Sequence, residues 1–410
     1  ARQTSVDISL GKDEVGRKAA GSYDEDPMFR AMTIKAIPSS EPLSELAKGA
    51  TTGWHVVDKK MAVGMAASAF YLGRDLVKTT DVPIGIIDVN LGHHFSNFWL
   101  SREALMETGK FYKSHKKDSA NTEVSGGVTQ HERMLAARKG GKQSSHGGTE
   151  DAPSVMQRPL FPYAGYRGTI LPLAGTGLKA VLLQLGNDYP YRLYQQVLES
   201  AEFSDFKGIA KTYEALDEVY WTTYTNRKYG FRQADKIIPR IPTDWRAAIG
   251  DEDLPFGLIV PPGSHLSTMG QHNREMRELQ RLVTEDTPNV SVILPGTEHR
   301  PFSAQPADDV LLAKRCLNWL EGAVYEKPEM PAGGPLFDRM EASFNQATIH
   351  FKEGTADGLK AHGNALDYFE VAGVEGDYSP ARATVDGQTI RLQSDTVLRI
   401  ARVRYNWNTR

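Results

Sequence analysis

"PIGIIDV", from Pro83 to Val89, is an almost continuous apolar run with one charged residue near its end. Three runs of the same kind follow along the chain: LKAVLLQLG (178–186), LPFGLIVPP (254–262) and NVSVILPG (289–296). A strand that is covered on both faces is apolar throughout, whereas a strand with one face in water alternates between apolar and polar residues. The four runs therefore predict buried strands of a parallel sheet.

Helical patterns lie between and after these runs. They are MAASAFYLGRDLVK (65–78), REMRELQRLVTED (274–286) and the segment 306–321. The last begins at Pro306, which suits a first helical position because that position needs no N–H, and Gly322 follows as a stop. Strands that alternate with helices predict an α/β fold, with a parallel sheet and helices on both of its faces.

Composition changes twice along the chain, and both changes predict domain organisation. Residues 109–153 are rich in Gly, Ser, Lys and His, which indicates a long excursion from the core. From about Pro331 onward the chain consists of short segments such as ATIHFKE (347–353), with turns at Asp-Gly and Glu-Gly pairs. We expect an α/β domain over 1–330, including the excursion, and a small β domain or extension over 331–410.

Charge, hydropathy and cysteine usage exclude some classes of function. The net charge is -3 and 40% of the residues are hydrophobic, as in an ordinary globular protein, so we expect no nucleic-acid partner. No stretch of eighteen apolar residues occurs, so we expect no membrane span. Cys316 is the single cysteine and lies on an apolar helix stripe, which predicts a buried structural thiol.

Several segments occur in the order found in one family of esterases. PTDWRAAIGDEDLPFGLI (242–259) resembles that family's D-W-R-A-x-W…P-F segment, REMRELQ (274–280) resembles its helix with R-E-A-Q, and ARVRYNWN (401–408) resembles its V-R-Y-A-W ending. By these motifs the chain resembles the sialate O-acetylesterase family. The resemblance implies a flavodoxin-like sheet of the SGNH-hydrolase type and a relation to carbohydrate O-acetylesterases.

The residues of the family's catalytic triad are all different here. The family's G-Q-S-N-M stretch corresponds to RQTSV, which places Thr4 at the serine, and its D-I-H-P stretch corresponds to SAQP, which places Ser303 at the aspartate and Gln305 at the histidine. Glutamine cannot accept a proton near neutral pH, so a general-base contribution of about 10²- to 10⁴-fold is lost. Three altered positions together predict loss of the esterase reaction.

Other positions of the family's site are retained. In DVNLGHHF (88–95) Gly92 keeps the place of the glycine whose N–H faces the oxyanion, and in LQLGNDY (183–189) Gly186 is kept. Asn187 follows it, and either donates a hydrogen bond to a ligand or belongs to a turn. For Asp88, at the end of its strand, we expect a structural role in holding the next loop.

Three functions remain open on this sequence. The favoured one is a non-catalytic protein that binds a carbohydrate or serves as a structural or assembly subunit, with no cofactor and no metal. The second is an active carbohydrate O-acetylesterase that uses Thr4 or Ser5 with His299 as a substitute base. The third is a metal-dependent hydrolase built on His93, His94 and His299, although no recognised metal motif is present.

The expected partners follow from the resemblance. An acetylated carbohydrate is the implied ligand. In the family a strand precedes the nucleophile motif, whereas this sequence begins two or three residues ahead of it. We therefore expect a fragment of a longer protein, or a second chain that completes the N-terminal side of the sheet. Because members of the family are often secreted or periplasmic, the implied location is extracytoplasmic.

Overall fold

The structure is a computed structural model. It describes residues 2–3, 9–12, 14–35, 39, 42–90, 99–101, 103–104, 165–184, 238–260, 267–294, 306–325, 327, 334–361 and 366–407. By its contacts the chain divides into two compact units, one comprising 1–261 with 275–292 and the other 262–274 with 293–410. The predicted domain boundary at 330/331 stays a prediction.

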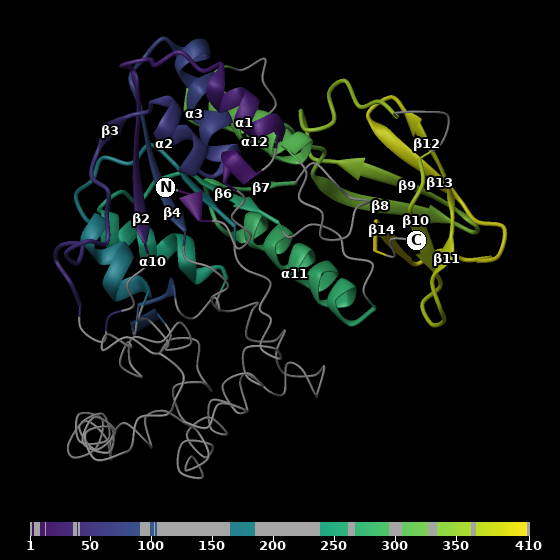
Figure 1. Cartoon of the computed structure of the whole chain (residues 1–410). Helices are drawn as coiled ribbons and strands as arrows, with labels where there is room; N and C mark the ends of the chain where they lie inside the picture. Colours follow the sequence, from purple (N-terminus) through teal and green to yellow (C-terminus); the bar gives the residue numbers. More distant parts are fainter. Residues whose placement is uncertain are drawn as a thin grey trace, which may run out of the picture. The chain divides into compact units, whose positions relative to one another are not determined.

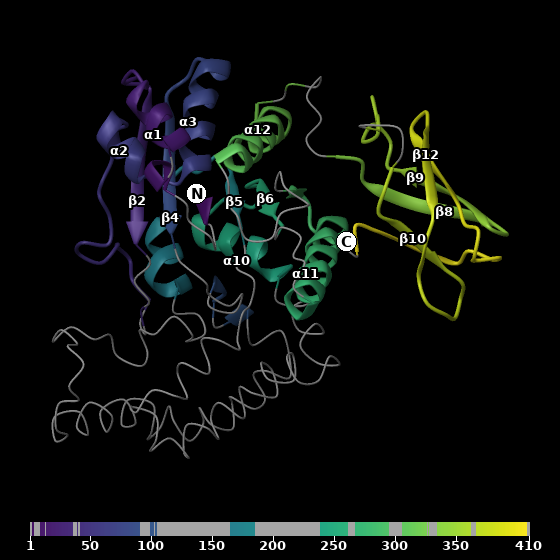
Figure 2. The ribbon, with the colours of Figure 1, turned by 45° about the vertical axis from the view of Figure 1, so that its right-hand side comes forward.

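The first unit is built on a seven-stranded sheet with the order β3-β2-β4-β1-β5-β6-β7. The strands are β1 (Arg2–Gln3), β2 (Phe29–Lys35), β3 (His55–Val56), β4 (Ile84–Asn90), β5 (Val181–Leu183), β6 (Phe256–Ile259) and β7 (Val290–Ile293). The β2–β4, β4–β1, β1–β5 and β5–β6 pairs are parallel, and β3 is antiparallel to β2 at the edge. Figure 2 shows β2, β4, β5 and β6 in this order, with the start of the chain between β4 and β5.

Helices accompany the strands along the chain. In chain order the helical segments are η1 (Leu10–Lys12), α1 (Glu14–Gly21), α2 (Lys59–Gly64), α3 (Ala67–Thr80), η4 (Tyr166–Ile170), η5 (Leu171–Leu173), α10 (Arg240–Ile249), α11 (Ser267–Asp286) and α12 (Pro306–Ala323). α1 contacts α2, and α3 contacts β2 and β4 (Figure 1). The chain is therefore mixed α/β with parallel strand pairs, which confirms the coarse part of the predicted fold class.

β4 has apolar cover on both of its faces. Ile87 and Val89 belong to a buried cluster that includes the core residues of α10. Ile86 points the other way, toward Gly73 of α3, where an added Cβ would lie 3.1 Å from Ile86 and 2.2 Å from the ring of Phe29. The absence of a side chain at Gly73 thus lets α3 pack closely on the sheet, and the near-continuous apolar run of β4 is explained by burial from both sides.

The strands and helices that the sequence predicts are present, with shifted ends. The four apolar runs correspond to β4, β5, β6 and β7, and the segments 65–78 and 306–321 correspond to α3 and α12. The predicted helix 274–286 is α11, which begins seven residues earlier, at Ser267. Cys316 is buried within α12, as expected for a structural thiol. Among the described helices, none is both long enough and apolar enough to cross a membrane.

Three strands of the sheet were not predicted. β2 has the sequence FRAMTIK, in which Arg30, Thr33 and Lys35 interrupt the apolar pattern. Its buried residues are Phe29 and Ala31 on one face and Met32 and Ile34 on the other. β3 is only two residues long. The central strand, which we expected ahead of this sequence or from another chain, is formed by Arg2–Gln3 itself. A second chain beside it stays a prediction.

The second unit contains two antiparallel sheets besides α12. The strands are β8 (Phe337–Ser343), β9 (Gln346–Phe351), β10 (Phe369–Ala372), β11 (Ser379–Pro380), β12 (Arg382–Asp386), β13 (Thr389–Gln393) and β14 (Arg402–Tyr405), in the orders β12-β13-β9-β8 and β11-β10-β14. Side chains of both sheets share one buried cluster, which includes Ile349 and Val371. The predicted Asp-Gly turn closes the β12–β13 hairpin, with Gly387 at φ 61°. The expected β character of this region is confirmed.

Candidate functional site

The carboxyl ends of the central parallel strands lie level with one another. In the pairing register Gln3 of β1 is beside Val89 of β4 and beside Leu183 of β5, and Leu183 is beside Leu258 of β6. In open α/β sheets, ligands bind in the crevice outside these carboxyl ends. The candidate site is therefore the edge of the sheet where β1, β4, β5 and β6 end.

The predicted site residues follow these strand ends in the sequence but lie outside the described residues. Thr4 follows β1, Gly92 comes two residues after β4, and Gly186 and Asn187 come after β5. The segment between β7 and α12 holds the remaining triad position, Gln305, and two more predicted residues. These two are His299 and Ser303, which lie outside the described residues as well, as do Ser5, His93 and His94 of the alternative sites.

Asp88 is the predicted residue at this edge that the structure describes. It is buried, with 4% of its surface exposed, and its Oδ2 accepts the N–H of Ala66 at 3.3 Å. Ala66 is the N-cap of α3 and has no capping side chain of its own. A carboxylate beside a helix N-terminus is stabilised by the partial positive charge there. This contact is made with α3. The next loop, which Asp88 was predicted to hold, lies outside the described residues, so that role stays a prediction.

Asp244 of α10 connects that helix to Ser101, which lies between β4 and η4 in the sequence. Its Oδ1 accepts the hydroxyl of Ser101 at 2.6 Å, and its Oδ2 accepts the backbone N–H of the same residue. The Ser101 hydroxyl oxygen in turn accepts the N–H of Ala104 at 3.0 Å. Hydrogen bonds to an ionised carboxylate are stronger than neutral ones, so this pair fixes Ser101 firmly.

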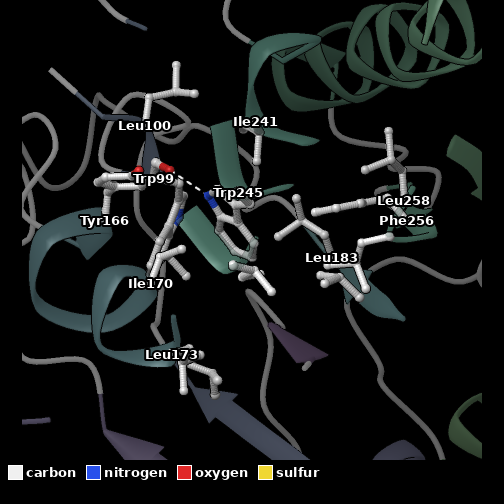
Figure 3. Packing of buried hydrophobic residues seen from close by; sticks show 14 of the residues in the cluster. Trp99, Leu100, Tyr166, Ile170, Leu173, Leu183, Ile241, Trp245, Phe256 and Leu258 are labelled. Atoms are coloured by element: carbon white, nitrogen blue, oxygen red, sulfur yellow. Dashed lines mark hydrogen bonds between the residues drawn. The ribbon is translucent and has the colours of Figure 1, made fainter. Parts of the chain in front are cut away.

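Trp245, the next residue, binds the same segment. Its indole N–H donates to the carbonyl of Trp99 at 2.7 Å, and the two rings meet edge to face with centroids 6.2 Å apart. Figure 3 shows this hydrogen bond inside a cluster of buried side chains that includes Tyr166 and Leu183. Trp99 is fully buried, so its carbonyl needs a protein donor, and Trp245 supplies one.

Arg246 is the last residue of the Asp-Trp-Arg triplet and binds backbone carbonyls in a different part of the sheet. Its guanidinium donates to the carbonyls of Leu254 (2.9 Å), Pro288 (2.8 Å) and Asn289 (3.2 Å), just ahead of β6 and β7. Burial lowers the pKa of Arg246, while nearby Asp253 opposes that shift. Arg246 therefore ties α10 to the amino ends of two strands, at the opposite edge of the sheet from the candidate site.

A buried tyrosine adjoins the Asp244 carboxylate. Burial raises the pKa of Tyr166 well above its ordinary value, and the negative charges of Asp244 and Glu103 raise it further. The phenol therefore stays protonated at neutral pH. The neighbourhood of Ser101 thus combines the carboxylates of Asp244 and Glu103 with the neutral hydroxyl groups of Ser101 and Tyr166.

Sequence reasoning recognised the Asp-Trp-Arg triplet but assigned it no role. Successive residues of a helix point about 100° apart, so three in a row can serve different partners. The partners themselves lie far away in the sequence: Ser101 is 143 residues from Asp244, and Trp99 is 146 residues from Trp245. No local pattern could have found them.

A metal site has no support among the described residues. In that part of the chain, no group of three His, Cys, Asp or Glu side chains is arranged to hold a metal ion. The three histidines of the metal-dependent alternative lie outside it.

Comparison with solved structures shows a likeness of fold, whereas comparison with families and curated proteins finds no match. Among solved structures, the chain is similar to a carbohydrate acetylesterase from Xanthomonas citri, with a TM-score of 0.69 and 17% sequence identity, over 100% of this chain and 76% of that chain. The two proteins share a fold. At this level of identity the likeness shows the fold alone.

Proposed function

We propose that this protein is sialate O-acetylesterase-like and binds an acetylated carbohydrate at the carboxyl edge of its sheet without hydrolysing it. The observation that carries the proposal is the combination of an acetylesterase fold with altered residues at all three triad positions. These are Thr4 for the nucleophile, Ser303 for the carboxylate and Gln305 for the base. A fold that is retained while the catalytic residues are altered favours binding of the sugar over its hydrolysis.

The strand order supports the finer assignment of the fold. Counted along the chain without β2 and β3, the run β4-β1-β5-β6-β7 has the order 2-1-3-4-5. This is the flavodoxin-like order, in which the ligand lies beside the first strand, where the strand order reverses. The residue that follows β1 is Thr4, so the altered nucleophile position comes directly after that switch point.

The altered triad residues explain why the protein would still bind an acetylated sugar although it no longer hydrolyses it. Ester hydrolysis needs a base that takes a proton from the nucleophile, and the amide of Gln305 cannot act as one. Binding needs only donors for the acetyl carbonyl and the sugar hydroxyls. In this proposal, the backbone N–H groups of Gly92 and Gly186 and the side chain of Asn187 are those donors.

An active carbohydrate O-acetylesterase is the second candidate. The observation that favours it is the hydroxyl of Thr4 directly after the central strand, with Ser5 next to it. His299, in the segment between β7 and α12, would then replace the missing base. A metal-dependent hydrolase with His93, His94 and His299 ranks third. An extracytoplasmic location and a second chain beside β1 stay predictions.

Calorimetric titration with an O-acetylated sialic acid, and with the same sugar after deacetylation, tests the binding. The proposal expects saturable binding of the acetylated sugar, much weaker binding of the deacetylated one, and no release of acetate during the titration. Equal affinity for both sugars, or no binding of either, would overturn it. Hydrolysis that disappears in Thr4→Ala supports the second candidate, and hydrolysis that a chelator abolishes supports the third.

A further inference from the structure

Gln184, the first residue after β5, is a buried polar residue at the candidate edge that the proposed function leaves without a role. We propose that Gln184 binds the ligand: its amide hydrogen-bonds the acetylated sugar and so helps to decide which sugar is bound. This inference rests on the proposed function and deepens it. Unlike the backbone donors Gly92 and Gly186 and the side chain of Asn187, Gln184 belongs to the residues that the structure describes.

The strand pairing places Gln184 at the switch point of the sheet. Leu183, the last residue of β5, is beside Gln3 of β1. In a sheet with the order 2-1-3-4-5, the ligand binds at the switch point between strands 1 and 3, which here are β1 and β5. Gln184 therefore follows β5 at the edge, and beside the strand, where this class of sheet binds its ligands.

The amide of Gln184 has no hydrogen-bond partner among the described residues. The residue is only 8% exposed, so water has little access to it. Moving a polar group out of water without giving it a hydrogen bond is unfavourable, and folded proteins rarely leave one in that state. Asp88, which is buried at the same edge, has a partner in the N–H of Ala66. Gln184 therefore needs a partner that the described part of the chain does not supply, and a ligand at this edge would supply it.

A primary amide matches the polar groups of an acetylated sugar. Its nitrogen carries two N–H donors, and its oxygen is an acceptor. The acetyl carbonyl only accepts hydrogen bonds, whereas a sugar hydroxyl both donates and accepts, so one amide can bind one of each. Deacetylation removes the carbonyl and leaves a buried N–H of Gln184 unpaired, which lowers the affinity. Gln184 thus gives a physical reason for the expected preference for the acetylated sugar.

Gln280 of α11 is a matched control. It is 1% exposed, and its amide has no partner in the described part of the chain either. It lies six residues before Asp286, the end of α11, and α11 leads into the amino end of β7. Burial without a partner therefore does not by itself point to a ligand. The place of Gln184 at the switch point does, and so only loss of the Gln184 amide is expected to affect binding.

The experiment compares three variants of the full chain with the wild type. Gln184→Leu removes the amide, Gln184→Glu keeps its shape but replaces the N–H donors with an acceptor, and Gln280→Leu is the control. Calorimetric titration measures the affinity of each protein for an O-acetylated sialic acid and for the same sugar after deacetylation. Urea denaturation without ligand measures the stability of each protein.

We expect Gln184→Leu to weaken binding of the acetylated sugar about tenfold, as for the loss of one or two hydrogen bonds, and so to narrow the difference in affinity between the two sugars. Gln184→Glu is expected to weaken it at least as much, because a carboxylate repels the acetyl carbonyl. Gln280→Leu is expected to keep the wild-type affinity. Neither leucine variant is expected to lower stability, since each replaces an unpartnered buried amide with an apolar side chain.

Wild-type affinity in Gln184→Leu, or an equal loss of affinity in Gln280→Leu, would overturn the binding role of Gln184 while the proposed function stands. A loss of stability in Gln184→Leu would overturn it as well, because the amide would then have a structural partner. A wild type that binds neither sugar overturns the proposed function, and this inference with it.

Discussion

Two arginines, one in each unit, make hydrogen bonds of similar length in very different surroundings. Arg246 in the first unit is 7% exposed and donates to three backbone carbonyls. Arg382 in the second unit has a side chain that is 67% exposed and bonds the Asp395 carboxylate at 2.6 Å. The shorter contact is the weaker one energetically, because water competes with it and salt screens it. For these two arginines we therefore expect burial, and not distance, to set the contribution to stability.

The largest expected effect comes from the buried arginine. Arg246→Met keeps the length of the side chain but removes the donor to the carbonyls of Leu254 and Pro288, while the Asn289 carbonyl keeps the N–H of Phe256 at 2.9 Å. We expect a loss of about 3 kcal/mol in the free energy of unfolding, since hydrogen bonds from a charged group contribute about 1.5–3 kcal/mol each and the Leu254 carbonyl is left buried without a donor. Urea denaturation measures it. A loss as small as that expected for an exposed ion pair would contradict the expectation that burial sets the contribution of these contacts.

A packing change in the same unit comes next. A Cβ at Gly73 would lie 2.2 Å from the ring of Phe29, so Gly73→Ala forces α3 away from the sheet. We expect a loss of about 1–3 kcal/mol, as for overpacking of a core. Gly64→Ala is the matched control, because an added Cβ there meets nothing within 4 Å. Equal stability of the two variants would contradict the close packing of α3.

The third prediction concerns one hydrogen bond in the buried cluster. Trp245→Phe removes the donor to the Trp99 carbonyl and keeps an aromatic ring in place, so we expect a loss of about 1 kcal/mol. Thermal denaturation followed by circular dichroism measures it. Trp54→Phe, at a half-exposed indole, is the control and is expected to change less. A larger effect at Trp54 would argue against the burial rule.

The smallest effect is expected at the exposed ion pair. Arg382→Ala removes the contact with Asp395 and should cost about 0.2–1 kcal/mol, decreasing further as salt is added. Denaturation at low and high salt concentration checks both parts of the prediction. A loss comparable to that of Arg246→Met, or one that salt leaves unchanged, would show that exposure does not set the rank of these contacts.

The sequence predicted those parts of the fold whose signal is local. The apolar runs of β4 to β7 and the helical patterns of α3, α11 and α12 are visible within each segment, and so are the turns of the second unit. β2 was not predicted because FRAMTIK carries a charge near each end. β1 was not predicted because two residues are too few to form a pattern. The amino-acid composition of a segment cannot report its pairing with strands that lie far away in the sequence.

The candidate site was also predicted only in part. Positions that follow strand ends were found from motifs, and the register brings β1, β4, β5 and β6 to one edge. The supporting contacts, Asp244 with Ser101 and Trp245 with Trp99, were not found, because each joins residues more than 140 positions apart. Such contacts depend on the whole fold, and a local sequence pattern does not indicate which distant residue will be the partner.

Release of acetate from an O-acetylated sialic acid tests the central claim most directly, with three proteins compared at equal concentration. They are the wild type, Thr4→Ala, and the combined variant Thr4→Ser, Ser303→Asp, Gln305→His. The account predicts that the first two release acetate no faster than buffer, and that the combined variant gains measurable hydrolysis. Wild-type turnover well above buffer that is lost in Thr4→Ala would contradict it.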